Sequence, residues 1–312
     1  MRYQSLKRRS RHFLAFTGLK VEEFERLAAE VREDWLSQRL KKLERPGRKR
    51  KPGGGRKPSL PELEDQLLLI LLWAKVYPSY LFLEYLFGID ESTVSRVISS
   101  TKLLLQGKFV FQDPRSQKGR KQVKTLEELR EILPPDIELE DILVDGTEQP
   151  IPRPERKTKR SKYHSGKKKR FTVKTQIATT KDGYILHVNG THPGRDHDYK
   201  IFKASMLPQI IPKGSKLYGD SGYQGVQKDF PDLYSVIPAK RSKSHPELTR
   251  SEKIMNTKQR KVRVKVEHAI SRLKKYQVLA QSYRHSLQNY ESTFRFVANI
   301  VNFRMLQRQM AV

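Results

Sequence analysis

Cysteine is absent from this sequence of 312 residues. Disulfide bonds and thiolate-bound metals are therefore excluded, and with them zinc ribbons and zinc fingers of the cysteine type. Any metal would have to be held by carboxylate, imidazole or carbonyl groups. Such ligands suit Mg²⁺ or Mn²⁺.

Long apolar stretches are also lacking. The longest run, Leu67–Ala74, is far too short to cross a bilayer. The beginning of the sequence, MRYQSLKRRSRHF, carries charge but no apolar segment of signal-peptide length. We therefore expect a soluble, intracellular protein with no membrane partner.

Acidic residues are scarce relative to basic ones. The chain has 34 Asp and Glu against 63 Lys and Arg, a formal net charge of +29. Self-repulsion of this size destabilises a folded chain unless a polyanion relieves it, and nucleic acid is the usual polyanion. An anionic membrane surface is the rival interpretation of the charge.

The first third of the sequence is typical of helices. Residues 1–44 are expected to form an N-terminal helical segment, because apolar residues recur at helical spacing from Val21 to Val31. Residues 45–61 contain seven Lys or Arg, four glycines and several prolines, and we interpret them as a flexible basic linker.

Residues 62–108 predict a helix-turn-helix DNA-binding domain. Helices are expected over 62–76, 79–87 and 91–105. Gly88 permits the tight turn, and Asp90 is a suitable N-cap for the last helix. Small polar residues and one arginine on its outer side suit a major groove, and the DNA-contacting candidates are Ser92, Ser95 and Arg96. An ordinary helical hairpin is the alternative.

Residues 139–312 predict a second domain of mixed strands and helices, so the fold class is α/β or α+β. A hairpin is indicated by Lys181-Asp182-Gly183. Strands are expected over 142–144, 171–179, 184–189, 215–219 and 233–237, and helices over 198–206, 260–281 and 291–310.

Three acidic residues of this domain stand at informative positions. Asp145 and Asp220 each follow a short apolar strand, whereas Glu267 lies within a helix. Three such carboxylates can converge on a pair of divalent metals that activate the attacking oxygen and stabilise the leaving oxygen of a phosphodiester displacement. Each could instead be a surface carboxylate or a turn residue.

Cations accompany these acids. Arg263 and Lys274 fall with Glu267 on one helical stripe roughly 40° wide, where they could hold phosphates. Residues 153–174 carry eleven Lys or Arg against one Glu, and a phosphate-tracking strip is indicated, with Lys167, Lys168, Lys169 and Arg170 as DNA-binding candidates. A solvated helix face and a solvated loop are the alternatives.

The loop 192–198 collects further metal-capable groups. We interpret His197 and Asp198 as possible accessory residues at the border of the active site. A zinc site and a plain polar loop are the alternatives.

Together these motifs resemble bacterial IS5-like insertion-sequence transposases of the DDE superfamily endonuclease type. Arg260 stands where the family pattern has tyrosine, which affects one contact to the DNA end. The matching blocks are Gly-Gly-Arg-Lys-Pro at 54–58, Leu67–Leu69, Leu86–Arg96, Asp145-Gly146-Thr147, Gly219–Gly225 and Arg263-x3-Glu267-x6-Lys274.

The resemblance implies a ribonuclease-H-like catalytic domain with a mixed five-stranded sheet. It implies Asp145, Asp220 and Glu267 as catalytic metal ligands, Mg²⁺ as cofactor with Mn²⁺ able to substitute, and a homodimer assembled on DNA. It also implies terminal inverted repeats and target DNA as partners, in the cytoplasm or nucleoid of a prokaryote. A DNA-binding relic without catalysis and a stand-alone nuclease of the same fold are the alternatives.

Overall fold

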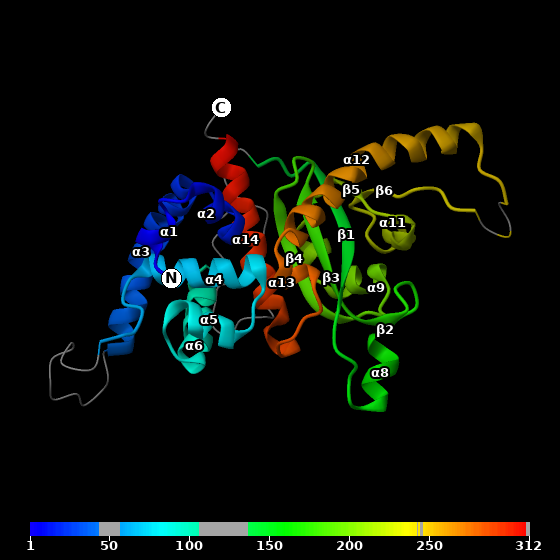
Figure 1. Ribbon diagram of the computed structural model, residues 1–312. Helices are drawn as coiled ribbons and strands as arrows, with labels where there is room; N and C mark the ends of the chain where they lie inside the picture. Colours follow the sequence, from blue (N-terminus) through cyan, green and yellow to red (C-terminus); the bar gives the residue numbers. More distant parts are fainter. Residues whose placement is uncertain (44–56, 106–136, 242, 244–245, 310–312) are drawn as a thin grey trace. The chain divides into compact units, whose positions relative to one another are not determined.

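The computed structural model describes residues 1–43, 57–105, 137–241, 243 and 246–309 (Figure 1). They form two compact units. The helical unit comprises the described residues up to 105, together with 275–278 and 303–309. The sheet unit comprises residues 137–274 and 279–302, apart from 242, 244 and 245.

The helical unit is built around one helix that is buried on all sides. Every side chain from Leu67 to Ala74 in α4 is buried, so this helix fills the centre of the unit. Tyr3, Phe13 and Phe24 add an aromatic cluster, with ring centroids of Tyr3 and Phe24 4.9 Å apart. The helices are α1 Tyr3–Leu6, α2 Ser10–Thr17, α3 Val21–Leu43, α4 Leu63–Val76, α5 Tyr80–Phe87 and α6 Glu91–Leu105.

The three helices predicted for the helix-turn-helix are confirmed as α4, α5 and α6. The Ser79 side chain accepts a hydrogen bond from the backbone N–H of Phe82 and caps α5. Gly88 ends α5 with φ 65°, a left-handed conformation that glycine adopts at low cost. Asp90 accepts a 3.0 Å hydrogen bond from the Thr93 hydroxyl at the start of α6.

The predicted linker lies mostly outside the described residues, because 44–56 are not among them. The described part, 57–61, is a loop that is anchored to the unit. Leu60 is buried, and its carbonyl accepts a 2.8 Å hydrogen bond from the Gln66 side chain.

Two late segments of the chain pack into the helical unit rather than with the rest of residues 139–312. The Tyr276 ring lies so close to Gly18 that a Cβ there would stand 2.8 Å from the tyrosine hydroxyl oxygen. Near the end of the chain, the Arg304 guanidinium pairs with Glu23 at 3.3 Å. Neither contact is encoded in any local sequence pattern.

The sheet unit contains a mixed sheet. Its path runs β2-β3-β1-β5-β6, and β4 pairs with β3. The β1–β3 and β3–β4 pairs are antiparallel, whereas β1–β5 and β5–β6 are parallel. The strands are β1 Asp141–Pro150, β2 His164–Ser165, β3 Arg170–Thr180, β4 Ile185–Pro193, β5 Lys216–Tyr218 and β6 Tyr234–Val236.

This arrangement is the predicted ribonuclease-H-like fold, with one correction. Five strands were expected, and the two-residue strand β2 makes a sixth. It pairs only with Arg170 and Phe171 at the start of β3. The predicted hairpin is also confirmed, because Gly183 adopts φ 87° between β3 and β4.

The prediction that a strand ends at Asp145 is wrong. β1 continues through Asp145 to Pro150, because β3 pairs with it along its whole length, from Ile142↔Thr180 to Pro150↔Thr172. What ends near Asp145 is the pairing on the other edge, where β5 reaches only as far as Leu143↔Tyr218. Asp145 therefore lies at a partly open edge in the middle of a rigid strand.

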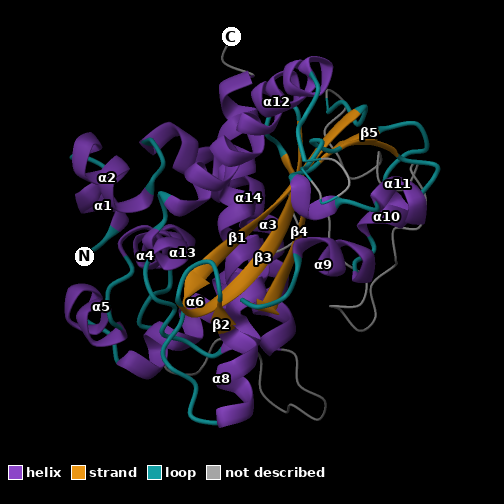
Figure 2. Ribbon diagram, turned by 90° about the vertical axis from the view of Figure 1, so that its right-hand side faces the viewer, coloured by secondary structure: helices purple, strands orange, loops and turns teal. Residues whose placement is uncertain are grey.

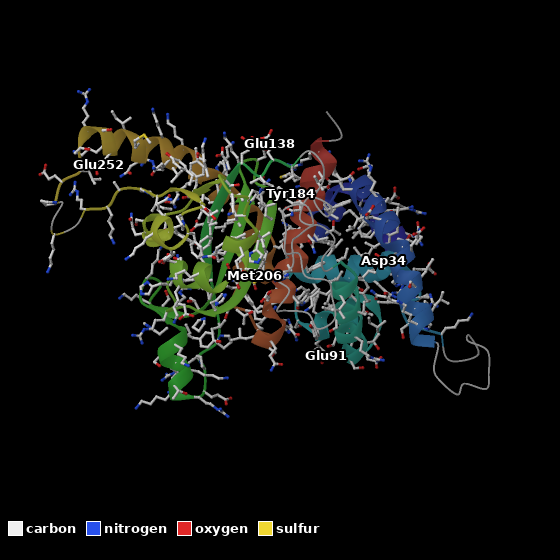
Figure 3. The ribbon with its side chains drawn as sticks, turned by 180° about the vertical axis from the view of Figure 1, so that it is seen from behind. Asp34, Glu91, Glu138, Tyr184, Met206 and Glu252 are labelled. Atoms are coloured by element: carbon white, nitrogen blue, oxygen red, sulfur yellow. The ribbon has the colours of Figure 1, made fainter. Side chains whose placement is uncertain are left out.

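The predicted helix over 260–281 begins ten residues earlier, as α12, and ends at Lys274. A capping box explains the start: the Thr249 hydroxyl accepts from Glu252 N–H, and the Glu252 carboxylate accepts from Thr249 N–H. Glu252 lies at the outer end of α12, away from the sheet (Figure 3). The helices are α8 Lys157–Tyr163, α9 Asp198–Ala204, α10 Leu207–Ile210, α11 Val226–Asp229, α12 Arg250–Lys274, α13 Gln277–Ala280 and α14 Tyr290–Gln309, with 3₁₀ turns η2 Ser221–Tyr223 and η3 Leu287–Asn289.

Helices cover both faces of the sheet (Figure 2). Side chains alternate along β3, so Thr175 and Gln176 point to opposite faces. Thr175 bonds to Tyr290 of α14, whereas the Gln176 amide donates to the Asp198 carbonyl of α9. Among the described residues, no helix has the length and apolarity to cross a membrane.

Candidate active site

Strand register places Asp145 beside Asp220. The parallel pairing of β1 with β5 ends at Leu143↔Tyr218, and Asp145 and Asp220 each follow two residues later in the chain. Asp220 does not continue the strand. Its side chain accepts a 2.8 Å hydrogen bond from Gly222 N–H and caps the turn η2. The two carboxylates are thus fixed by backbone geometry, one within a strand and one at a helical turn.

Asp198, the first residue of α9, approaches the same region. Gly146 leaves the space for it, because a Cβ at that position would stand 2.5 Å from Asp198 Oδ1. Lys174 Nζ lies 3.2 Å from Asp198 Oδ1 and 4.0 Å from Glu148 Oε1. Gln176 donates to the Asp198 carbonyl at 2.9 Å and to the Tyr223 hydroxyl oxygen at 2.7 Å.

Burial and neighbouring charge raise the pKa of Asp145 to about 6. Desolvation is the main cause, and Asp220 and Asp198 add to it. The hydrogen bond from Gly146 N–H and the Arg263 guanidinium act in the opposite direction. A buried carboxylate beside two others is electrostatically unfavourable, and bound positive charge would stabilise it.

The charges of the same three carboxylates act on the hydroxyl of Tyr223. Tyr223 is fully buried, and burial followed by the charges of Asp198, Asp145 and Asp220 raises its pKa well above the ordinary value. The phenol therefore stays protonated and neutral at physiological pH. It can serve as a hydrogen-bonding group but not as a base.

A cavity of about 550 Å³ lies beside Asp220. It is lined by three cations, Lys240, Arg241 and Arg263, together with Ser221, Pro238 and Ala239. The cavity therefore brings together a carboxylate that could bind a metal ion and cations that could bind phosphate. This is the arrangement expected around a phosphodiester undergoing displacement.

Glu267 lies on α12, one helical turn after Arg263, and the two side chains are 3.9 Å apart. Its side chain is 54% exposed. Lys274 turns elsewhere, since its Nζ lies 3.3 Å from the Glu148 carbonyl. Burial and the charge of Lys168 lower the pKa of Lys274.

The basic strip predicted over 153–174 includes an exposed turn before β3. Lys169 adopts φ 52° at its tip. All four DNA-binding candidates of this turn are exposed: Lys167, Lys168, Lys169 and Arg170. His197 is also exposed and occupies the N-cap position of α9, without a side-chain capping bond.

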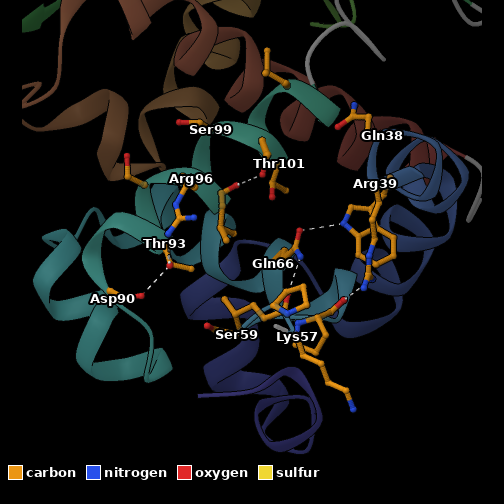
Figure 4. A pocket seen from close by; sticks show the side chains of 18 residues that line it. Gln38, Arg39, Lys57, Ser59, Gln66, Asp90, Thr93, Arg96, Ser99 and Thr101 are labelled. Atoms are coloured by element: carbon orange, nitrogen blue, oxygen red, sulfur yellow. Dashed lines mark hydrogen bonds between the residues drawn. The ribbon is translucent and has the colours of Figure 1, made fainter. Parts of the chain in front are cut away.

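In the helical unit, α6 borders a groove of about 770 Å³ (Figure 4). The opposite wall is formed by Trp35 and Arg39 of α3 and by the loop that contains Lys57. Ser95 and Arg96 both line it, whereas Ser92 lies exposed outside. Thus the polar residues of α6 divide between a groove and open solvent.

Arg96 is held along its own helix. Its guanidinium donates to the Thr93 hydroxyl at 2.9 Å and to the Ser92 carbonyl at 3.2 Å. Val94 and Ile98 are buried, while Val97 is half-buried at the groove. Arg96 must therefore give up local hydrogen bonds to contact a base.

Sequence reasoning missed several members of the site. Lys174 and Gln176 are two residues apart on β3, so both point to the face of α9, yet Lys174 reads as one more cation of the basic residues 153–174. Lys240 and Arg241 follow β6 by several residues, and only the cavity connects them with Asp220. The sequence signal that could have found Gln176 is an amide side chain among the apolar residues and threonines of the strand.

The comparisons with known proteins identify the family. The DDE superfamily endonuclease model matches residues 144–302, which include every carboxylate of the candidate active site. The chain belongs to the DDE superfamily endonucleases. The helix-turn-helix model of DDE superfamily endonucleases matches residues 58–109.

A relative of this DDE endonuclease is the "Probable transposase for insertion sequence element IS702" of Microchaete diplosiphon. The two are 29% identical over 258 residues, which covers 83% of this chain and 85% of the relative. The predicted family, an insertion-sequence DDE transposase with an N-terminal helix-turn-helix, is thereby confirmed.

DDE superfamily endonucleases depend on divalent metal. Among the described residues, no three His, Asp or Glu side chains lie close enough together to hold a metal ion. Two carboxylates do fit one, because Mg²⁺ is commonly bound by one or two carboxylates with water and substrate phosphate completing its shell. The raised pKa of Asp145 supports this fit.

Proposed function

We propose that this DDE endonuclease is an active transposase that cuts DNA at the terminal inverted repeats of its element and joins the ends to target DNA. The observation that carries the proposal is the placement of Asp145 beside Asp220, next to a cavity lined by three cations. Carboxylates alone would repel DNA, whereas cations alone would bind it without cutting.

The proposed reaction has two steps of one type. A water oxygen first attacks the phosphorus at the element end, and the bond from phosphorus to the 3′-oxygen breaks, which leaves a 3′-hydroxyl. That hydroxyl then attacks a target phosphodiester, forms a new bond to phosphorus and releases the 3′-oxygen of the target. Both are displacements at phosphorus, so one site serves both without an external energy source.

Asp145 and Asp220 would hold Mg²⁺, or Mn²⁺ in its place, and the exposed Glu267 side chain would have to turn toward them to serve as the third ligand. When bound, such an ion supplies Lewis-acid activation of the attacking oxygen and stabilisation of the leaving oxygen. Arg263 would hold phosphates of the element end, and Lys274 would have to leave the Glu148 carbonyl to join it. Asp198 is an accessory group that Lys174 orients at 3.2 Å.

The exposed turn Lys167, Lys168, Lys169 and Arg170 would bind DNA phosphates. On the helical unit, α6 would recognise the terminal repeat through Ser92, Ser95 and Arg96. Two element ends must be brought together for joining, so we propose that the chain acts as a homodimer on DNA in a bacterial nucleoid.

The deciding experiment combines binding, cleavage and joining on duplexes that carry the ends of the element. Asp145→Asn, Asp220→Asn and Glu267→Gln should each abolish Mg²⁺-dependent cleavage nearly as fully as all three together, because residues that act as a unit are strongly non-additive. DNA binding should persist. Asp232→Asn, which removes an exposed carboxylate of the sheet unit, is the matched control.

The outcomes separate the alternatives. If the wild-type protein cleaves the duplex but does not join a pre-cleaved end to target DNA, the protein is a stand-alone nuclease. If the wild-type protein and all variants bind DNA and none of them cleaves it, the protein is an inactive DNA-binding protein. If Glu267→Gln cleaves DNA at the wild-type rate and Asp198→Asn does not cleave, the role of third ligand belongs to Asp198 and not to Glu267.

Recognition by α6 is tested separately. Arg96→Ala should cost roughly 1–3 kcal/mol of preference for the element end over random DNA if Arg96 contacts a base edge. Arg11→Ala, which removes an exposed cation of α2, is the control. Equal loss of preference in both variants would remove Arg96 from the recognition surface.

A further inference from the structure

A second cavity, of about 550 Å³, lies in the sheet unit beyond the end of β1. Two segments distant in sequence form its walls: the chain from Ile151 to Tyr163, and the chain from Tyr283 to Leu287. Four cationic side chains line it, with His285 and two tyrosines, and Glu155 is the one carboxylate among its described lining residues. The cations are Arg153, Arg156, Lys159 and Arg284.

Hydrogen bonds hold the two walls together. Tyr283 N–H donates to the Pro150 carbonyl at 2.9 Å, and the Gln149 side-chain amide donates to the Gln281 carbonyl at 2.8 Å. Ile151 N–H donates to the Phe171 carbonyl at 3.0 Å and continues the ladder between β1 and β3. The second wall is thus fastened to the last residues of β1.

The loop that carries the arginines is also fixed. The Arg160 guanidinium donates to the Pro154 and Glu155 carbonyls, both at 2.8 Å, and so ties α8 to this loop. The side chains of Arg153, Arg156 and Lys159 themselves are exposed, and no ion pair within the described chain engages them. The cavity therefore has a rigid frame and cations available to a ligand.

The cations and their spacing favour a phosphodiester chain as the ligand. Guanidinium groups match the geometry of phosphate oxygens and bind them through two hydrogen bonds at once. Ile151 directly follows β1 and lies roughly 20 Å from Asp145, because a strand rises about 3.4 Å per residue. At about 3.4 Å per nucleotide along one strand of DNA, that separation is about six nucleotides.

We propose that this cavity is a second DNA-backbone site, which binds phosphates of the same duplex about six nucleotides from the scissile phosphate. The inference rests on the proposed function, since it takes the DNA cut at Asp145 as the ligand. It adds Arg284 and His285, which lie far along the sequence from the basic strip, to the surface that contacts DNA. An acidic protein segment is the competing occupant.

The test compares two double variants with equal loss of charge. Arg153→Ala/Arg156→Ala removes two cations of the cavity. Lys213→Ala/Lys216→Ala removes two exposed cations at the opposite end of the sheet. There, Lys216 of β5 lies opposite Asp141, the first residue of β1, in the strand register. Binding is measured against salt concentration, on element-end duplexes that extend either about four or about fifteen base pairs on each side of the cleavage position.

On the long duplex, the cavity variant should bind about tenfold or more weakly than wild type, because each lost contact is a hydrogen bond to a charged group. The negative slope of log affinity against log salt should become shallower by about two, because two phosphate contacts disappear. On the short duplex, which does not reach the cavity, wild type and variant should bind equally. The control variant should match wild type in its preference for the long duplex.

Arg153→Lys/Arg156→Lys keeps the charge and should retain the salt slope of wild type, which separates a loss of contacts from a loss of fold. Equal affinity of the cavity variant and the control on the long duplex would overturn the inference, and would be the result if an acidic protein were the ligand. The proposed function would stand in that case, provided wild type still cut the duplex. Failure of wild type to bind either duplex would refute both.

Discussion

Removing the charge of Asp145 is expected to stabilise the metal-free protein at neutral pH. The pKa of Asp145 is raised to about 6 from an ordinary value of 3.8, chiefly by burial. Between these two values the folded state retains a proton that the unfolded state has lost. The free energy of unfolding therefore falls as the pH rises through this window.

The size of the effect follows from the shift. Two pKa units correspond to about 3 kcal/mol, at about 1.4 kcal/mol per unit. Asp145→Asn removes the ionisation at every pH, and its amide oxygen can still accept the 2.8 Å hydrogen bond from Gly146 N–H. We expect the variant to be more stable than wild type by up to about 3 kcal/mol at pH 7.5, and by about 1 kcal/mol at pH 4.5.

Urea unfolding with excess chelator, at both pH values, measures the difference. Asp232→Asn is the control, because it changes the net charge equally at a carboxylate whose side chain is 65% exposed. Its stability should not show the gain seen at Asp145. A gain for Asp145→Asn that is equal at the two pH values, or a loss at pH 7.5, would refute the burial argument.

Divalent metal should reverse the order of the two proteins. An ion that binds only the folded state stabilises it by mass action, and it should do so more for wild type than for Asp145→Asn. Mg²⁺ should also bind more tightly as the pH rises through about 6, since a ligand carboxylate must be deprotonated. Equal metal stabilisation of both proteins would exclude Asp145 as a ligand.

Three further changes test the packing. Burial lowers the pKa of Lys102 to about 8. Lys102→Met should therefore raise the free energy of unfolding by up to about 3 kcal/mol at pH 7, as measured by urea titration. This gain should become smaller as the pH approaches 10, where the lysine is neutral in the folded state. Gly18→Ala places a Cβ 2.8 Å from the Tyr276 hydroxyl oxygen at φ 79°, and thermal melts should show a loss of about 1–2 kcal/mol or more. Glu291→Ala leaves the buried Arg295 without its 2.6 Å ionic partner and should cost roughly 3 kcal/mol in urea unfolding; a change below about 0.5 kcal/mol would contradict that pairing.

Much of the fold was predictable because local patterns encode it. The helices around Gly88 follow from apolar periodicity, a cap at Ser79 and a glycine that accepts positive φ. The hairpin at Gly183 follows for the same reason. The start of α12 was also encoded, in the Thr249-x-x-Glu252 capping box, and the prediction placed the helix start too late because it followed only the apolar residues.

The length of β1 was not predictable from its own residues. Asp145 and Gly146 interrupt the apolar run, and both remain in the strand because β3 pairs with it without a break from Ile142 to Pro150. The pairing partner lies some thirty residues further along the chain. A polar residue stays in a strand when the ladder with the neighbouring strand continues past it.

The residue types alone limit the chemistry: there is no cysteine, cations are in excess, and carboxylates stand in the Asp145, Asp220 and Glu267 blocks. Which of these groups meet depends on how the chain folds. Strand register sets Asp145 beside Asp220, and the gap at Gly146 admits Asp198, whereas Lys274 turns toward Glu148. Local propensity acts between near neighbours, but proximity across a sheet depends on the pairing of whole strands, which no single motif contains.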